Sequence, residues 1–311
     1  MFKRLCRKLG INPLDRLLKK AASKNAKKVL VCWNRGLGDI PLGLYALVIR
    51  IRHFMPDVQI SFLTRKDLES GFHMLEDVGV LVDPDWKRRV PFDTAASLKK
   101  LGKDIADYDL VLERPDPTNW LQWQIGKLTP RLKWNAQWDD LWQKFGLVKE
   151  GPYIGVHVQT ETFYDYEKNW PQKHWDEFFR LAAAEYNANI VLFGFSQEPM
   201  FNIPGVIDLR GKTNLFEMLS IIKNRCRYLL VPDSGVLSIA YYIDENFPIR
   251  IVSLWADPKQ GILRQKVASP NAGLRHCALI GKNKDLSRVP VEAVVKKLFC
   301  EGEDVCQKTL F

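Results

Sequence analysis

Four short stretches of the chain carry the residues that could do chemistry, and each includes or follows an apolar run typical of a strand. They are NRGLGDIP (residues 34–41), HVQTETFYDYEKNWPQKHW (157–175), LFGFSQEP (192–199) and LLVPDSGVLS (229–238). The carboxyl ends of parallel strands meet at one edge of a sheet, and the ligands of such sheets bind there. The four stretches are therefore candidate ligand-binding loops.

The first stretch presents Asp39, a carboxylate that has two interpretations. Gly36 and Gly38 fit the first two glycines of the dinucleotide fingerprint G-x-G-x-x-G, but Pro41 stands at the third position, which disfavours a nicotinamide-dependent oxidoreductase. Asp39 either caps the helix that Pro41 begins, since Asp and Pro favour a first helical turn, or acts as a general base.

The next two stretches offer groups that suit a phosphate and a sugar or ribose. Thr160 follows a strand, and Lys168 comes just before a helix start, where backbone N–H groups already favour a phosphate. Glu198 lies in a loop past a strand and can accept hydrogen bonds from sugar hydroxyls. Taken alone, Lys168 is better explained as a surface lysine, and Glu198 can be a solvated loop acid.

The fourth stretch runs from a strand through Asp233, Ser234 and Gly235 into a helix. Gly235 lets a ligand approach the backbone closely, and the amides at the helix start suit a diphosphate. An ordinary capped turn explains the same residues. The common position of all four stretches, at strand ends, is what favours a ligand site over four unrelated loops.

The elements between these loops alternate between strand and helix patterns, as in parallel sheets covered by helices. The pattern predicts strands at 29–33, 58–63, 109–113, 153–158, 190–194, 228–232 and 250–254. It predicts helices at 41–54, 68–78, 95–105, 174–186, 214–224, 236–243 and 291–299. A Trp-rich stretch at 114–150 interrupts the alternation, and packing or sugar stacking would each explain it.

This alternation predicts an α/β protein with two doubly wound, Rossmann-like domains at 29–150 and 151–311, and a ligand site in the cleft between them. The last helix, 291–299, is a candidate to pack back on the first domain. No apolar run is long enough to cross a bilayer. The six cysteines show no metal-binding spacing and predict reduced thiols.

The net charge of +10 is concentrated in residues 1–28, which hold ten basic residues and one acid. The nearly neutral remainder argues against a nucleic-acid partner. Residues 1–28 also read as a basic amphipathic helical segment, with Asn12 and Pro13 as the cap and first residue of its second helix. Such a segment either docks on an anionic membrane surface or packs on the body with a solvated basic face.

Six segments, in order, resemble glycosyltransferase family 9, the bacterial heptosyltransferases of lipopolysaccharide core assembly. They are RGLGDIPLGLYAL, MPDVQISFLT, KNWPQKHW, VLFGFSQE, LRGKTNLFEMLSIIKN and VPDSGVLSIA, within a resemblance that covers about residues 28–300. The resemblance implies a GT-B fold, with an acceptor-binding domain at 29–150 and a nucleotide-sugar donor-binding domain at 151–311.

The resemblance also implies roles for individual residues. Asp39 would be the general base, Lys168 would contact the donor diphosphate, and Glu198 would hold the donor sugar. The other donor-binding residues would be Thr160, Thr213, Asp233, Ser234, Gly235 and Ser238. Gly38 and Arg114 are the residues expected to contact the acceptor. Two features depart from the family pattern: Ser238 stands where the family usually has histidine, and the loop between Thr160 and Lys168 is longer.

Together, these observations predict an inverting, metal-independent enzyme without a cofactor. It would move a heptose from an ADP-linked donor onto a lipopolysaccharide core or similar glycolipid. The expected location is cytoplasmic, on the inner face of the bacterial inner membrane through residues 1–28. The alternative is a degenerate GT-B protein that binds nucleotide-sugar or glycolipid without turnover, which Ser238 keeps open.

Overall fold

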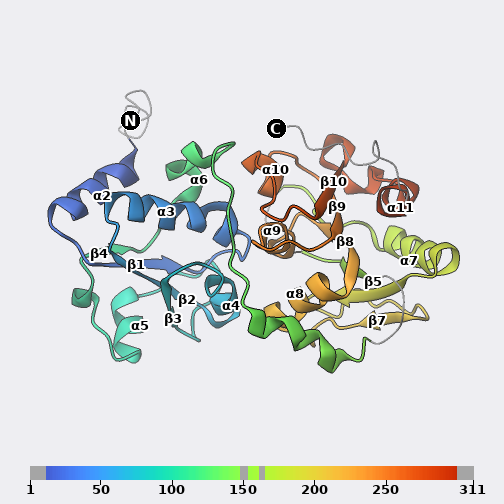
Figure 1. Cartoon of the computed structure of the whole chain (residues 1–311), viewed down its shortest axis with the longest axis horizontal. Helices are drawn as coiled ribbons and strands as arrows, with labels where there is room; N and C mark the ends of the chain where they lie inside the picture. Colours follow the sequence, from blue (N-terminus) through green and yellow to red (C-terminus); the bar gives the residue numbers. More distant parts are fainter. Residues whose placement is uncertain (1–11, 148–152, 161–164, 300–311) are drawn as a thin grey trace. The chain divides into compact units, whose positions relative to one another are not determined.

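The computed structural model describes residues 12–147, 153–160 and 165–299. The chain divides into two compact units, Met1–Leu132 and Lys133–Phe311 (Figure 1). Each unit is an α/β structure built on a parallel sheet, as the alternation of patterns predicts. The predicted first helix of the N-terminal segment lies outside the described residues.

The first unit contains a four-stranded parallel sheet in the order β3-β2-β1-β4. Its strands are β1 (Lys28–Trp33), β2 (Gln59–Thr64), β3 (Val78–Val82) and β4 (Leu110–Leu112). Strand β3 replaces the end of the helix predicted at 68–78. Only η2 (Lys66–Leu68) and α4 (Glu69–Phe72) are helical there, because the chain turns at Asp77, which has a φ of 47°, before pairing with β2.

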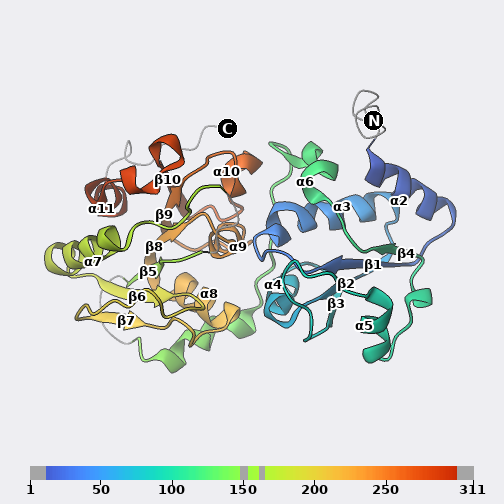
Figure 2. The same cartoon turned by 180° about the vertical axis from the view of Figure 1, so that it is seen from behind.

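Helices flank this sheet on both sides (Figures 1 and 2). They are α2 (Pro13–Ser23), the π-helix η1 (Ile40–Leu44), α3 (Tyr45–Phe54), α5 (Thr94–Lys100), η3 (Ile105–Asp107), α6 (Pro117–Trp120) and η4 (Gln122–Gln124). The predicted helix at 41–54 is thus a π turn followed by α3. Gly43 makes room at this turn, because a Cβ there would lie 2.6 Å from Cβ of Pro117.

Helix α2 packs beside α3 as part of the first unit (Figures 1 and 2). Asn12 caps it as predicted, accepting a hydrogen bond from the Leu14 amide at 3.0 Å. Leu14 and Leu18 are completely buried. The carboxylate of Asp15 binds the guanidinium of Arg50 on α3 at 2.5 Å. The apolar side of α2 is therefore used by the fold, and its lysines remain exposed.

The second unit contains a six-stranded parallel sheet in the order β10-β9-β8-β5-β6-β7. Its strands are β5 (Tyr153–His157), β6 (Asn189–Phe193), β7 (Val206–Asp208), β8 (Cys226–Pro232), β9 (Ile249–Trp255) and β10 (Leu274–Ile280). The sequence patterns predict neither β7 nor β10. These two strands form the edges of the sheet, where one neighbour is enough and a strongly apolar run is not required.

The helices of the second unit begin with η5 (Ala136–Phe145), α7 (Gln172–Tyr186) and α8 (Leu215–Asn224). They continue with α9 (Gly235–Tyr241), α10 (Gly261–Gln265), η6 (Lys282–Lys284), η7 (Leu286–Arg288) and α11 (Val291–Phe299). Helix α11 packs against α7 in the core of this unit, through Val291, Val294 and Leu298. The apolar stripe of this helix is thus buried within the second unit, and its packing on the first domain stays a prediction.

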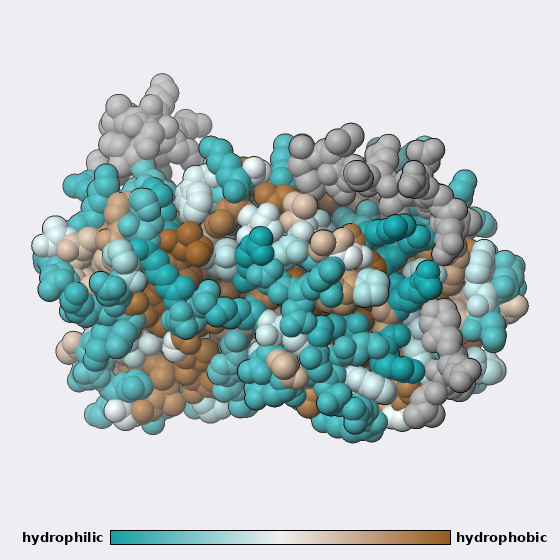
Figure 3. All heavy atoms as spheres, viewed as in Figure 1, coloured by the Kyte–Doolittle hydropathy of each residue, from teal (hydrophilic) through white to brown (hydrophobic). Residues whose placement is uncertain are grey.

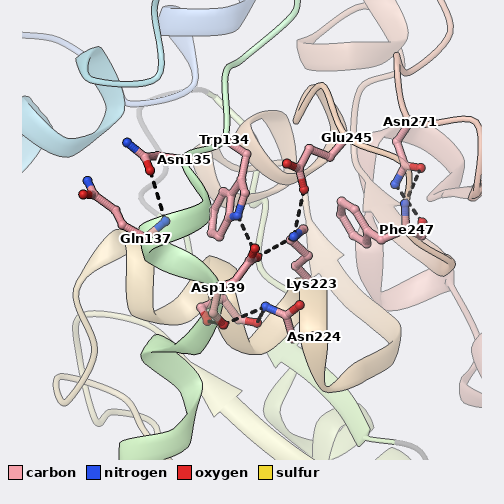
Figure 4. A network of polar contacts seen from close by, with 10 residues as sticks. Trp134, Asn135, Gln137, Asp139, Lys223, Asn224, Glu245, Phe247 and Asn271 are labelled. Atoms are coloured by element: carbon pink, nitrogen blue, oxygen red, sulfur yellow. Dashed lines mark hydrogen bonds and ion pairs between the residues drawn. The ribbon is translucent and has the colours of Figure 1, made fainter.

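Three tryptophans of the Trp-rich stretch belong to this unit, because η5 packs on α8. The ring of Trp138 stacks on Phe216 at 3.8 Å, and the Trp134 indole donates a hydrogen bond to Asp139 (Figure 4). The backbone amide of Trp142 donates to Ser220. Packing and hydrogen bonding within this unit explain the Trp134 and Trp138 side chains, and the units divide after Leu132, where the sequence pattern places the division at 150.

Cys32 and Cys226 are buried free thiols, as predicted. Cys277 is disulfide-bonded, so the prediction of a reduced thiol is wrong for this residue. Scattered cysteines give no signal of which segments the fold brings together. No helix within the described ranges is long and apolar enough to cross a membrane. Polar residues cover much of the face seen in Figure 3, with smaller hydrophobic areas between them.

Candidate active site

The order of strands in the first unit reverses between β1 and β4, which makes this the expected ligand position of the sheet. The loops that follow these two strands line a cavity of about 410 Å³. Arg114, predicted from the sequence to contact an acceptor, lines it together with Arg35, Arg89 and Glu113. The cavity thus carries three guanidinium groups and one carboxylate.

Asp39 lies in the loop after β1, and its carboxylate does not cap the following helix. Its Oδ2 instead accepts a hydrogen bond from the Gly36 amide at 3.0 Å. Gly36 allows this arrangement, since a Cβ there would lie 3.0 Å from the same oxygen. The capping interpretation of the Asp39 side chain is therefore wrong. Gly38 is half-buried, and its carbonyl accepts a hydrogen bond from the Leu42 amide at 3.2 Å.

Opposing effects act on the proton affinity of Asp39. Burial raises the pKa of its carboxyl group, whereas the Gly36 amide and the positive charges of Arg35, Arg88 and Arg89 lower that pKa, with burial the larger effect. A carboxylate with a raised pKa is a stronger base than a solvated one. The surrounding arginines favour its ionised form, in which it can accept a proton.

The arginines beside Asp39 come from a loop that the sequence analysis did not single out. Asn34 is buried at the end of β1, and its amide donates to the carbonyls of Lys87 and Val90, at 3.2 and 2.8 Å. The Asn34 carbonyl accepts from the Arg89 amide. This clamp holds Arg88 and Arg89 near Asp39. In the sequence these arginines are visible as the run KRR at residues 87–89. The run lies about fifty residues from Asp39, so the sequence alone does not indicate that the two are close.

In the second unit the strand order reverses between β5 and β8, and the loops after these strands bring two predicted residues together. Lys168 Nζ contacts Asp233 Oδ2 at 2.5 Å, with about a tenth of each side chain exposed. Burial raises the pKa of Asp233, Lys168 lowers it, and the nearby Asp257 raises it further. Lys168 is thus a buried, paired cation and not a surface lysine.

Gly261 and Asp257 are site residues that sequence reasoning missed. Gly261 has a φ of +49°, and a Cβ there would lie 2.5 Å from Asp233 Oδ1 and 2.8 Å from the Trp255 ring. Asp257 Oδ2 lies 3.7 Å from Lys284 Nζ. Both follow β9, at the edge that carries Asp233. A single glycine in a polar loop gives no sequence signal of such a close approach.

Ser234 caps α9, because its hydroxyl accepts from the Leu237 amide at 3.2 Å. Gly235 is the first residue of that helix. Ser238 is 1% exposed, and its hydroxyl donates to the Ser234 carbonyl at 3.1 Å. The residue that departs from the family pattern therefore makes a bond within its own helix and presents almost no surface to a ligand.

The other predicted donor residues lie at the same edge of the sheet. Thr160 follows β5, and its backbone amide and carbonyl both bond the side chain of Asn169, at 2.6 and 3.0 Å. Glu198 is exposed in the loop after β6, and Thr213 is half-buried just before α8. No described contact joins Glu198 or Thr213 to Lys168.

The loop of Glu198 is anchored by Arg210, another residue that the sequence analysis missed. Arg210 is completely buried and binds Asp208 at 2.7 Å. Its Nη1 donates to the Pro199 carbonyl at 2.7 Å. The pair of an arginine and an aspartate two residues apart at a strand end was the available signal. Within the described ranges, no group of three or more acidic, histidine or cysteine side chains could hold a metal ion.

Comparison with known proteins gives a consistent result. Residues 117–247 match the model of glycosyltransferase family 9 (heptosyltransferase). The ADP-heptose LPS heptosyltransferase II of E. coli superposes with a TM-score of 0.61 and 16% identity, over 86% of this chain and 96% of that chain. A family 9 glycosyl transferase from Veillonella parvula DSM 2008 gives a TM-score of 0.55 and 17% identity, over 87% and 95%.

No curated protein matches the sequence significantly. At such identities, the two structures establish the fold, which is GT-B as predicted. The family match covers the loops that carry Lys168, Glu198 and Asp233. Family match and fold agree: residues 117–247 match the heptosyltransferase family 9, and the chain is a glycosyltransferase.

Proposed function

We propose that this protein transfers a heptose from an ADP-linked donor to a glycolipid acceptor of the lipopolysaccharide core type. The family match supports the class of reaction. The structural relative from E. coli supports the donor, since it is an ADP-heptose transferase. The arginines beside the first-unit cavity support an acceptor that carries anionic groups, because guanidinium groups pair with carboxylates and phosphates.

Asp39 is the general base of the proposed reaction. The observation that carries this assignment is its carboxylate, held by the Gly36 amide among arginines where the strand order reverses. Asp39 takes the proton of the acceptor hydroxyl as that oxygen bonds the anomeric carbon. The bond from that carbon to the diphosphate breaks on the opposite face, so the configuration inverts. Gly38 and Arg114 contact the acceptor.

The second unit holds the donor in this proposal. The amides of Ser234 and Gly235 and the ammonium of Lys168 stabilise the charge that develops on the departing diphosphate. The ion pair with Asp233 keeps Lys168 in one position. Glu198 accepts hydrogen bonds from the sugar, and Thr160 and Thr213 lie near the nucleotide. These cationic and amide groups let the reaction proceed without a metal ion.

We propose further that the enzyme acts in the cytoplasm as a peripheral protein on the inner membrane, through residues 1–28. Because Leu14 and Leu18 are buried against the body, α2 docks by charge and not by inserting its apolar face. The exposed lysines of α2 face away from the fold and support this mode of binding.

The decisive experiment measures transfer and donor hydrolysis with a panel of ADP- and UDP-sugars for wild type and Asp39→Ala. We expect transfer from an ADP-linked heptose, and a loss of about 10²- to 10⁴-fold in kcat for Asp39→Ala with donor affinity unchanged. Asp57→Ala, which removes an exposed carboxylate of the same unit, is the control.

Two results would contradict the proposal. Turnover unchanged in Asp39→Ala would remove the base assignment. Donor binding by wild type without transfer or hydrolysis would favour the degenerate binding protein, which the buried position of Ser238 leaves as the second candidate.

A further inference from the structure

Gln124 is a buried glutamine whose side chain is costly for the fold. It ends the short 3₁₀ helix η4 in the first unit, and only 3% of it is exposed. Its side-chain oxygen Oε1 is buried and accepts no hydrogen bond from any described residue. A buried polar atom without a partner costs free energy, whereas methionine would fill a similar volume without that cost. The value of a glutamine at this position must therefore lie in its amide nitrogen.

The amide nitrogen of Gln124 reaches the helical turn that follows Asp39. Its Nε2 donates a hydrogen bond to the Leu42 carbonyl at 3.0 Å. The backbone amide of Leu42 in turn donates to the Gly38 carbonyl at 3.2 Å. Gly38 immediately precedes Asp39 in the chain. Two hydrogen bonds through one residue therefore connect Gln124 to the backbone that carries the candidate base.

Leu42 lies in the π turn η1, which is a rare element of backbone structure. Turns of this kind interrupt the regular hydrogen bonding of a helix, and they occur often at functional sites. Gly43, the next residue of the turn, packs closely on Pro117 of α6, since a Cβ at Gly43 would lie 2.6 Å from the Pro117 Cβ. The α6–η4 segment (residues 117–124) therefore holds the π turn in two ways, by close packing at Pro117 and by the hydrogen bond from Gln124.

The α6–η4 segment is itself anchored to the rest of the first unit. Asn12 Nδ2 donates a hydrogen bond to the Trp120 carbonyl at 2.6 Å, which ties the end of α6 to the start of α2. The Gln124 carbonyl accepts hydrogen bonds from the amides of residues 127 and 128, both at 2.9 Å. The backbone of Gln124 is thus fixed on both sides, and its side chain reaches the π turn from a defined position.

We propose that Gln124 is a positioning residue for Asp39. Its hydrogen bond to Leu42 fixes the π turn, and the fixed turn holds the Asp39 carboxylate in the orientation in which it bonds the Gly36 amide. The inference deepens the proposed function and rests on it, because it takes Asp39 as the general base. Misplacing a reacting group by about 1 Å can lower a rate by about two orders of magnitude, so a residue that touches no substrate can control turnover.

The test compares Gln124→Met with Gln122→Met in the full chain. Gln122 is an exposed glutamine of the same 3₁₀ helix, so the control matches the test variant in residue type and segment. Each variant is measured alone and combined with Asp39→Ala, in transfer from an ADP-linked heptose. Hydrogen exchange at residues 36–45 reports the order of the π turn independently of activity. Titration calorimetry gives the affinity for ADP, and the melting temperature verifies that each variant is folded.

We expect Gln124→Met to lower kcat by about 10- to 100-fold with the affinity for ADP unchanged, and Gln122→Met to leave both at the wild-type values. Because Gln124 acts through Asp39, adding Gln124→Met to Asp39→Ala causes no further loss of kcat. Hydrogen exchange at residues 36–45 becomes faster in Gln124→Met alone. Its melting temperature stays close to that of wild type, since removal of the unpartnered oxygen offsets the lost hydrogen bond.

Three results would overturn the inference, and they separate it from the proposed function. If Asp39→Ala loses turnover and Gln124→Met does not, the inference fails and the base assignment stands. If the loss in Gln124→Met adds in full to that of Asp39→Ala, Gln124 supports the fold and does not act through Asp39. If Asp39→Ala keeps full turnover, the base assignment fails and the inference fails with it.

Discussion

Asp39 shows how a side chain that fits the sequence pattern of a helix cap can make a different contact in the folded chain. Its position before Pro41 is that of a helix cap, yet its carboxylate bonds the Gly36 amide behind it. The π turn at Ile40–Leu44 receives no side-chain cap hydrogen bond from Asp39. The carboxylate is therefore held by the loop itself, among arginines.

Those arginines lead to a prediction on pH. A general base works in its ionised form, so kcat/KM rises as the pH rises through the pKa of Asp39. Arg88 lowers that pKa against the larger effect of burial. The variant Arg88→Gln removes this positive charge, raises the pKa and moves the acidic limb of the kcat/KM profile to higher pH. Arg180→Gln in the second unit is the control, and a shift of the limb to lower pH would contradict the prediction.

Gly261 allows a test of the Lys168–Asp233 pair. Gly261→Ala places a methyl group against the Asp233 carboxylate and adds the backbone cost of an alanine at positive φ, about 1–2 kcal/mol. Gly146→Ala at a φ of +62° has nothing within 4 Å and carries only the backbone cost. We expect Gly261→Ala to lose more stability than Gly146→Ala in urea unfolding, because it adds the steric clash to the backbone cost, and only Gly261→Ala to bind ADP more weakly. Equal ADP affinity of the two variants would contradict a role of the Lys168–Asp233 pair in donor binding.

The sequence predicts which residues lie at the ends of the strands better than it predicts the residues that contact them. Lys168, Asp233 and Asp39 follow recognisable strands, so the sequence is enough to place them at the sheet edges. Arg210, Asp257 and the arginines at 88–89 lie in polar loops without a pattern, and only the folded chain brings them to the site. A sequence pattern reports what a residue's neighbours along the chain require, and these partners are neighbours only in space.

Among the helices and strands, those with two buried faces or a strong amphipathic stripe were predictable. Strands β1, β5, β8 and β9 lie inside their sheets and read as apolar runs. The edge strands β7 and β10 did not, because one neighbour and partial burial leave a weaker pattern, and the apolar run of β3 was missed beside the helix predicted at 68–78. Helix α2 was predicted with its cap, but its sequence could not say whether its apolar side meets lipid or protein.

The exposed side of α2 gives the prediction for membrane binding. Lys19, Lys20 and Lys24 are exposed, and each lysine near an anionic surface contributes about 1 kcal/mol to binding. We expect Lys19→Gln/Lys20→Gln/Lys24→Gln to reduce binding to phosphatidylglycerol vesicles by about two orders of magnitude. The same change at Lys99, Lys100 and Lys103, exposed in the same unit, is the control. If both triple variants lose binding equally, net charge and not α2 is responsible.

The two units of the whole chain each have a sheet and buried side chains of their own, which predicts that they are separable in function. Residues 133–311 contain every predicted donor residue. Expressed alone, this segment is expected to bind ADP within about ten-fold of the affinity of the full chain, by calorimetry, and to transfer no sugar because Asp39 is absent. Folded material that does not bind ADP would show that the donor site needs the first unit.

Two tryptophan rings of the second unit lie close to cations, which makes the protein its own optical probe. Lys223 lies 5.4 Å from the Trp134 ring and Arg225 lies 4.7 Å from the Trp142 ring. Indole emission responds to the electric field of charges at such distances. An anion that enters beside these cations changes that field at two tryptophans at once, so its arrival can be followed by intrinsic fluorescence without any attached dye.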